Sequence, residues 1–179
     1  MARFNIVEGY GVTLRRLTSD KIELLRHWRN HPKIQKYMEY REEITPEQQI
    51  AWFNRIDNEN NYYFIIEIDG KEIGCINIRD IDYEKGEGEP GIFIWDDDYL
   101  KGRISYHAGL CMGDFLYDNL GLRRCVIHIL SNNQRSIHYH KSLGYKLSEN
   151  QEGIFNQEYS RTREDYRLVR DELKSRLGF

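Results

Sequence analysis

The stretch YLKGRISYHAGLCMGDFLYDNLGLRRCVIHILSNNQRSIHYHKSLGY, residues 99–145, decides the fold. From residue 104 to 120 the apolar side chains lie mostly on one stripe at helical spacing, which predicts an amphipathic helix. Residues 125–130 form a β-branched apolar run, typical of a buried strand. Asn133 can cap a second helix, which Gly144 ends as the left-handed residue. A turn that opens a helix beside a strand can hold an anion on free backbone N–H groups, so an anionic cofactor is expected here.

Composition narrows the class of protein. The 179 residues fit one domain, and we expect a single domain over residues 1–179. The net charge is -3 with both signs interspersed, which disfavours a nucleic-acid partner. No apolar run approaches the roughly 20 residues that span a bilayer, so no membrane partner is expected. The first five residues lack the apolar core of a signal peptide, which predicts a cytoplasmic location.

Cysteine and tyrosine usage adds two expectations. Cys75, Cys111 and Cys125 are odd in number and lie in apolar contexts, which indicates buried reduced thiols rather than a disulfide framework. Tyrosine occurs 13 times, which suits a pocket wall, ordinary strands or a homodimer interface.

The first part of the chain predicts one strand followed by helices. Residues 10–17 alternate apolar and polar side chains, as a half-buried strand does. The next helix should end before His31-Pro32, because a residue that precedes proline avoids the helical region, and Pro32 can itself start a short helix. Thr45-Pro46 then offers an N-cap and a proline at the first helical position of a third helix.

Strands dominate the middle of the chain. Asp69-Gly70, between two apolar runs, is the clearest hairpin signal. A further strand is expected at residues 91–95, a last strand at 166–170 and a helical end at 172–177. Antiparallel pairs followed by a strand–helix–strand unit predict a single-domain α/β fold, with a mixed, mostly antiparallel sheet flanked by helices.

Several pieces of sequence together carry a resemblance to a known family. They are LLRHWRNHP at residues 24–32, Trp52-Phe53, LGLRR at 120–124, NQRS at 133–136 and LGY at 143–145. In this combination the chain resembles the GCN5-related N-acetyltransferase (GNAT) superfamily. It is most similar to the sugar-nucleotide N-acetyltransferases of pseudaminic-acid synthesis and, more distantly, to the ribosomal-protein N-terminal acetyltransferases.

The resemblance implies acetyl-CoA as the acetyl donor and no metal. It also implies a splayed central pair of strands that holds the cofactor, with backbone N–H groups that polarise the thioester carbonyl. In this chain the cofactor-binding residues would be Phe93, Ile94, Trp95, Lys101, Gly102, Arg103, Ile104, Ser105, Asn133, Ser136 and His140.

The pyrophosphate turn departs from the family pattern. Glycines that normally let the backbone approach phosphate fall here on Arg103 and Ser105. Lys101, Gly102 and Arg103 could offset the change with one shifted glycine and two cations. Alternatively, CoA binding could be weak or altered.

The residue at the position of the general acid also departs from the family pattern. The family tyrosine that protonates the leaving thiolate falls on His140, with Tyr139 beside it. A phenol stays protonated at neutral pH, whereas an imidazole is a good acid when it is charged, with an ordinary pKa of about 6.5. The register favours His140 and the chemistry favours Tyr139, so both are candidates.

The assignments of the base and of the acceptor-binding residues rest on the same resemblance. Glu89 matches the family position of the base, acting directly or through water, although a solvated glutamate in a charged turn is the alternative. The resemblance places the acceptor pocket at the end of the first helix. The expected contacts are Trp28, Arg29, Asn30, His31 and Tyr63. His27 and His31 have the spacing of two metal ligands, but no pattern completes a metal site.

The sequence therefore predicts an acetyl-CoA-dependent N-acetyltransferase that acts by direct transfer in a ternary complex. The expected partner is a small-molecule amine, most closely the amino group of a sugar nucleotide. The alternatives are acetylation of a protein N-terminus and a degenerate, non-catalytic module that binds CoA, or no CoA, and serves as a sensor or interaction module.

Overall fold

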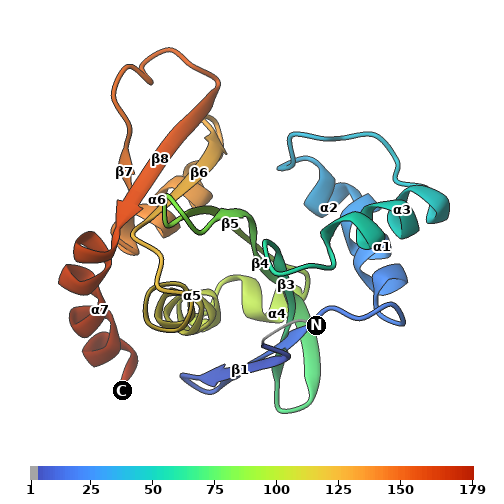
Figure 1. Cartoon of the computed structure of the whole chain (residues 1–179), viewed down its shortest axis with the longest axis horizontal. Helices are drawn as coiled ribbons and strands as arrows, with labels where there is room; N and C mark the ends of the chain where they lie inside the picture. Colours follow the sequence, from blue (N-terminus) through green and yellow to red (C-terminus); the bar gives the residue numbers. More distant parts are fainter. Residues whose placement is uncertain (1–3) are drawn as a thin grey trace.

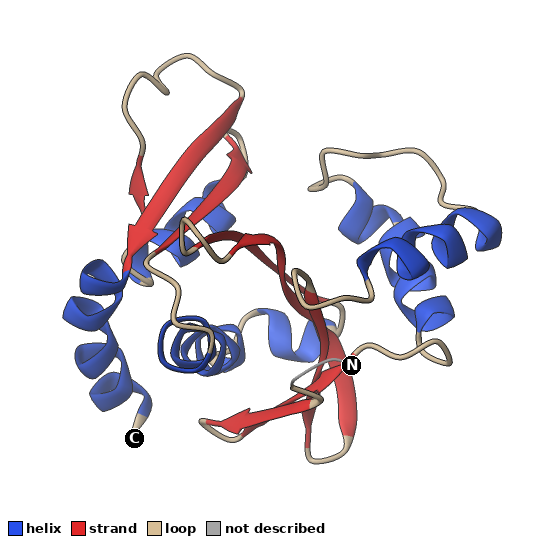
Figure 2. Cartoon of the chain, in the orientation of Figure 1, coloured by secondary structure: helices blue, strands red, loops and turns tan. Residues whose placement is uncertain are grey.

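One eight-stranded sheet runs through the molecule in the order β1-β2-β3-β4-β5-β6-β8-β7 (Figures 1 and 2). The computed structural model describes residues 4–179, so residues 1–3, which also entered the expectation about a signal peptide, lie outside the described residues. All neighbouring strands are antiparallel except β5 and β6, which are parallel. The strands are β1 Ile6–Gly9, β2 Val12–Arg16, β3 Tyr62–Ile68, β4 Lys71–Asp82, β5 Glu87–Ile94, β6 Arg124–Leu130, β7 Lys146–Leu147 and β8 Asn156–Thr162.

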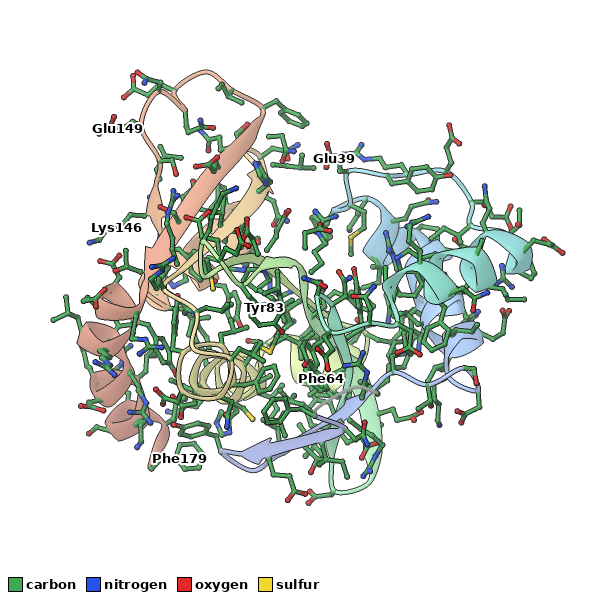
Figure 3. All side chains as sticks on the ribbon, in the orientation of Figure 1. Glu39, Phe64, Tyr83, Lys146, Glu149 and Phe179 are labelled. Atoms are coloured by element: carbon green, nitrogen blue, oxygen red, sulfur yellow. The ribbon has the colours of Figure 1, made fainter. Side chains whose placement is uncertain are left out.

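Helices cover both faces of the sheet, as predicted. They are α1 Ile22–Asn30, α2 Pro32–Gln35, α3 Pro46–Ile56, α4 Asp97–Leu100, α5 Ile104–Asp114, α6 Gln134–Ser142 and α7 Arg163–Leu177, with a π-helical turn η1 Phe115–Asn119 after α5. The larger core packs α5, η1 and α7 against one face, and Phe64, labelled in Figure 3, is fully buried in it. The smaller core packs α1 and α3 against the other face around Trp28 and Phe53. The predicted α/β class is confirmed.

Local signals explain most of these elements. Thr45 forms a complete capping box with Gln48 at the start of α3, and Asn133 caps α6 through the Ser136 N–H at 3.2 Å. Asp69 and Gly70 both have positive φ, as the tight turn between β3 and β4 requires.

The two parallel strands separate almost as soon as they meet. β5 and β6 pair at Glu87–Arg124 and Gly88–Cys125 and nowhere beyond. The next residue of β5 whose backbone faces β6 is Pro90, which has no N–H to donate. Proline at this position therefore helps to end the pairing, and the strands diverge from there (Figure 1). This is the splayed central pair that the sequence led us to expect.

The predicted last strand at residues 166–170 is wrong, because these residues lie in α7. Thr162 and Asp165 form a capping box that starts the helix, and Tyr166 and Leu173 are its buried residues, seven positions apart. The true last strand, β8, was missed because most of its residues are polar and its buried positions are Tyr159 and Arg161.

Two other boundaries differ from expectation. Tyr10 and Gly11 have positive φ and form the turn between β1 and β2, so the strand predicted at residues 10–17 begins at Val12. The helix predicted over residues 104–120 stays α-helical to Asp114 and then widens into η1, where the Leu120 N–H donates to the Phe115 carbonyl.

The three cysteines are buried and free, as predicted. Among residues 4–179, no helix has the length and hydropathy of a membrane span.

Candidate functional site

The edge of β5 that faces the gap carries unpaired backbone groups. The Trp95 N–H donates to the Ile73 carbonyl at 2.8 Å, continuing the β4–β5 ladder. Because backbone groups alternate in direction along an antiparallel strand, Phe93 and Trp95 face β4, whereas Ile92 and Ile94 face the gap. Of the three predicted thioester contacts, Ile94 is thus the one whose N–H points to the gap, and Ile92 is an additional donor that the sequence did not single out.

The N-terminus of α5 lies at the predicted phosphate turn. Arg103 occupies the N-cap position without a side-chain cap, and the first helical bond returns from the Tyr106 N–H to the Arg103 carbonyl at 2.9 Å. The N–H groups of Ile104 and Ser105 precede that bond and are the orphan donors of the helix start. Arg103 itself donates to the Arg176 carbonyl of α7 at 3.3 Å. Lys101 and Gly102 are exposed at this turn.

A further cation joins the turn from α6. The Arg135 guanidinium donates to the Leu100 carbonyl, just before Lys101. Asn133, which caps the same helix, is two residues away in sequence. Arg135 lies within the NQRS motif, but the sequence alone indicated no role for it. The predicted phosphate residues and Arg135 therefore come together at the adjoining starts of α5 and α6.

The two candidate acids lie side by side on α6. The Tyr139 hydroxyl donates to the Ser105 carbonyl at 2.9 Å, and its ring contacts that of His140 edge-on, with centroids 4.8 Å apart. His140 Nδ1 lies 2.8 Å from the Ser136 carbonyl, which fixes the proton on Nδ1 because a carbonyl can only accept. Burial lowers the pKa of His140 to about 4, and burial raises that of Tyr139. At neutral pH both groups are uncharged.

A cavity of about 30 Å³ connects these helices to the β5 edge. Pro90, Gly91 and Ile92 line it from β5, and Tyr139 and His140 line it from α6. It has room for about two water molecules. The separated strands, the unpaired N–H groups and the two candidate acids therefore meet in one place, which fits the thioester end of the expected cofactor.

Arg161 is a buried cation at the wall of this cavity. Its side chain donates from Nη1 to the Leu143 carbonyl at 2.9 Å and from Nε to the Tyr117 hydroxyl at 3.2 Å. The Tyr145 ring packs under the guanidinium at 4.4 Å. These contacts tie β8 to the C-terminal end of α6, so we interpret Arg161 as a structural residue.

The opposite face of the sheet carries the predicted base. Glu89 lies within β5 rather than in the preceding turn, opposite Arg79 of β4. Its carboxylate accepts from Arg79 Nη2 at 2.8 Å and lies 3.4 Å from Nδ1 of His128 on β6. The carboxylate therefore spans the opening between the strands.

Aromatic side chains pack together at the C-terminal end of α1, near the same face of the sheet. Trp28 is buried and stacks on Trp95 at 5.9 Å, and the Lys33 ammonium lies 3.9 Å from the centre of the Trp95 ring. His31 packs edge-on against Trp95, and its Nδ1 accepts from the Lys33 N–H at 3.2 Å as the N-cap of α2. Trp28 and His31 thus have structural partners in this resting arrangement.

The other predicted acceptor contacts divide into two kinds. Asn30 is committed, because its amide pairs with both backbone polar groups of Ile44. Arg29 is not, because its Nε is buried and has no hydrogen-bond partner among residues 4–179. Tyr63 packs edge-on against Trp52, and burial raises the pKa of Tyr63 to about 12, so the phenol is a hydrogen-bond donor at neutral pH.

The described residues contain no group of three histidine, cysteine or acidic side chains placed to hold a metal. Glu39, between α2 and α3, and Glu149, between β7 and β8, lie on two connections at the top of the view in Figure 3.

Comparison with known proteins agrees with this geometry. Residues 12–146 match the family model described as an acetyltransferase (GNAT) domain. An uncharacterised protein of Methanocaldococcus jannaschii, MJ1062, is 26% identical over 147 residues, which are 80% of this chain and 30% of that protein. The chain thus spans less than a third of that relative. Spermidine N(1)-acetyltransferase of Escherichia coli K12 is 23% identical over 140 residues, covering 78% of this chain and 75% of the enzyme.

A solved structure shows the same fold over nearly the whole chain. Apo FdhC, described as a nucleotide-linked sugar GNAT, superposes with a TM-score of 0.77 at 21% identity, covering 98% of this chain and 97% of the other. The match of the family model over most of the chain, together with the separated β5 and β6, shows that this protein belongs to the GNAT acetyltransferase family.

Proposed function

We propose that this protein transfers the acetyl group of acetyl-CoA to the primary amine of a nucleotide-linked amino sugar, by direct transfer in a ternary complex. The observation that carries the proposal is the gap between β5 and β6. It has unpaired N–H groups and a phenol on the α5–α6 side, and a carboxylate on the α1–α3 side. A thioester held in the gap would meet an amine from the opposite face.

The chain's own groups would divide the chemistry as follows. The Ile94 N–H, aimed into the gap, would donate to the thioester oxygen as negative charge develops there. Tyr139 would protonate the departing sulfur, because burial raises its pKa and keeps it protonated, and its O–H, which here donates to the Ser105 carbonyl, can turn about the C–O bond toward the sulfur. His140, neutral and with its one N–H directed at the Ser136 carbonyl, would shape the wall instead. The acceptor ammonium would lose its proton on the side of the gap where Glu89 lies.

Direct transfer is supported by the state of the cysteines. Burial raises the pKa of Cys75 and of Cys111 to about 12, and raises that of Cys125 as well. A thiol that stays protonated is a poor nucleophile, so none of the three suits an acyl-enzyme step.

The acceptor is inferred from charge and aromatic surface. Arg29 has an unpartnered Nε–H, and Lys33 lies over the Trp95 ring close to α1. Cations beside aromatic faces suit a nucleotide diphosphate, whose phosphates pair with guanidinium and ammonium groups. The similarity of fold to a nucleotide-linked sugar GNAT supports the same class.

A polyamine is the second candidate, because a spermidine N(1)-acetyltransferase aligns with three quarters of its own length. A polyamine needs carboxylates, and two half-buried carboxylates, Glu89 of β5 and Glu158 of β8, lie on the acceptor face, each also paired with an arginine. Protein N-terminal acetylation and binding without catalysis remain the less supported alternatives.

The test measures melting temperature with acetyl-CoA, then release of CoA with amino-sugar nucleotides, spermidine and a short peptide in parallel. We expect acetyl-CoA to raise the melting temperature and an amino-sugar nucleotide to give the highest kcat/KM. A higher kcat/KM with spermidine would instead identify a polyamine as the acceptor, in place of a nucleotide-linked amino sugar. No stabilisation by saturating acetyl-CoA would refute the enzyme and favour the degenerate module.

A further inference from the structure

A histidine that played no part in the sequence analysis faces the acceptor side of the gap. His128 lies on β6, and its Nδ1 is 3.4 Å from Glu89 Oε1 on β5. The same carboxylate oxygen accepts from Arg79 Nη2 of β4 at 2.8 Å. Three neighbouring strands thus contribute one row of side chains, Arg79, Glu89 and His128, and the row crosses the opening where β5 and β6 part. The His128 side chain is 41% exposed and the Glu89 side chain 27%.

The contact with Glu89 fixes the tautomer of His128. An ionised carboxylate can only accept, so the Nδ1 that faces it carries the proton. In a neutral imidazole the other nitrogen, Nε2, then has the free lone pair. No side chain or backbone group among residues 4–179 is recorded in a hydrogen bond with His128 Nε2. The imidazole is therefore oriented by Glu89 and presents a basic atom away from it.

The pairing with Arg79 makes Glu89 the less suitable proton acceptor. Its Oε1 already accepts a charge-assisted hydrogen bond from a guanidinium and is therefore engaged. A carboxyl group ordinarily titrates near pH 4 and an imidazole near 6.5, and the most effective general base titrates close to the working pH. Between the two, an imidazole is better matched to removing a proton from an ammonium near neutral pH.

Charged side chains of neighbouring strands surround His128. On β8, Glu158 is the cross-strand partner of His128, and Arg124 of β6 pairs with Glu158 at 3.7 Å and with Glu87 of β5 at 3.3 Å. His128 therefore lies between two carboxylates, Glu89 and Glu158, and each of them also contacts an arginine. The ring is also 41% exposed, so a proton that it takes up can pass to water.

We propose that His128 is the general base of the acetyl transfer and that Glu89 and Arg79 are the residues that position it. This assignment rests on the proposed amine acetylation. The acceptor ammonium gives one proton to His128 Nε2 and becomes a neutral amine. The amine nitrogen forms a bond to the thioester carbon, the carbon–sulfur bond breaks, and the nitrogen loses a second proton as the sulfur gains one. The products are the amide, CoA as the thiol, and a proton that imidazolium releases to solvent.

The experiment compares wild type with His128→Gln, Glu89→Gln and a matched control, His138→Gln. His138 is an exposed histidine of α6 outside this row. The kcat and kcat/KM for the acceptor are followed between pH 5.5 and 9, and KM for acetyl-CoA is measured for each variant. We expect His128→Gln to lower kcat by about 100-fold or more and to remove the rising limb of the profile in the range where imidazoles titrate. KM for acetyl-CoA should stay unchanged, and His138→Gln should match wild type.

Glu89→Gln separates the two candidate bases. If His128 is the base, this variant keeps a rising limb in the range where imidazoles titrate, because the basic Nε2 of His128 is retained. Free imidazole should also restore part of the activity of His128→Ala. A His128→Gln variant that keeps its limb and stays within about twofold of wild type would overturn the proposal.

A second measurement does not depend on turnover. Nitrogen-15 NMR of the imidazole reports which ring nitrogen is protonated in the resting enzyme. We expect the Nδ1–H tautomer for His128 in wild type and its loss in Glu89→Ala. A dominant Nε2–H tautomer in wild type would overturn the proposal even if the protein acetylates amines. Absence of turnover with every amine would instead refute the proposed function.

Discussion

The Tyr139 hydroxyl donates to the Ser105 carbonyl at 2.9 Å and thereby joins α6 to the first turn of α5. These two residues lie 34 positions apart in sequence. One end of the contact is the candidate acid and the other is the helix start expected to bind the pyrophosphate. This hydrogen bond therefore holds the proposed acid, the residue that would protonate the sulfur, against the turn that is expected to bind the phosphates.

Replacement of the Tyr139 hydroxyl tests the assignment of the acid. We expect Tyr139→Phe to lower kcat by about 100-fold, within the range of general acid catalysis, while His140→Phe lowers it much less. The physical reason is that the protonated Tyr139 hydroxyl can turn its O–H from the Ser105 carbonyl toward the sulfur, whereas the ring N–H of the neutral His140 is fixed toward the Ser136 carbonyl. Steady-state kinetics at saturating acetyl-CoA provide the measurement.

Tyr106→Phe is the matched control, because its ring lies 5.2 Å from that of Tyr139. It should leave kcat close to that of wild type. A larger loss in His140→Phe than in Tyr139→Phe would move the acid to His140, as the register of the family motif indicates.

The buried His140 also makes stability depend on pH. Its pKa is about 4 in the folded protein and about 6.5 in an unfolded chain, so the unfolded state binds more protons between these values. Stability therefore rises with pH through this window, is complete above about pH 6.5, and falls by up to about 3 kcal/mol as the pH drops to 4. Urea unfolding at several pH values measures the slope. His140→Gln should flatten it by that amount, and an unchanged slope would contradict the burial of a neutral imidazole.

Substitutions at two glycines, Gly113 and Gly102, test core packing and cofactor binding separately. A Cβ at Gly113 would clash with Cζ of Tyr166, a fully buried ring, so Gly113→Ala should destabilise the fold by about 1–3 kcal/mol. A Cβ at Gly102 would meet nothing closer than 3.6 Å, so Gly102→Ala should leave the melting temperature unchanged.

If Gly102 lets the backbone approach the pyrophosphate, Gly102→Ala should instead reduce the rise in melting temperature produced by acetyl-CoA. Thermal melts with and without the cofactor measure both effects. An undiminished rise would show that the shifted glycine has no part in phosphate binding.

The fold was largely predictable because its signals are local. Pro46 after Thr45, Asp69-Gly70 and the apolar run at 125–130 each specify structure within a few residues, and all three elements are present. The strand β8 was not predictable, because its place depends on pairing with β6 and its inward residues include a charged Arg161.

The candidate site divides in the same way. Residues near a motif, such as Asn133 and Ser105, could be located from spacing along the chain. The contact between Glu89 and His128 could not, because it joins two strands that diverge after two paired positions. The engagement of the Trp95 N–H with Ile73 likewise depends on the register of the sheet.

The last prediction concerns Asn30, whose amide holds the segment between α2 and α3. Its Nδ2 donates to the Ile44 carbonyl at 2.9 Å and its Oδ1 accepts from the Ile44 N–H at 2.9 Å. Asn30→Ala removes both bonds and leaves the partly buried Ile44 N–H without this acceptor, so a loss of about 1–3 kcal/mol is expected in urea unfolding. Asn54→Ala on the exposed face of α3 is the control and should not lose stability.

The same substitution distinguishes a structural Asn30 from a direct acceptor contact. A structural role predicts that Asn30→Asp is also destabilising, because a carboxylate cannot donate to the Ile44 carbonyl. If Asn30 is structural, its substitution should raise KM for the acceptor only as far as the segment of residues 36–45 becomes less ordered. Hydrogen exchange of the backbone amides in that segment measures this loss of order. If Asn30→Ala instead raised KM for the acceptor by about tenfold with unchanged stability and unchanged exchange, Asn30 would contact the acceptor itself, as the family resemblance first implied.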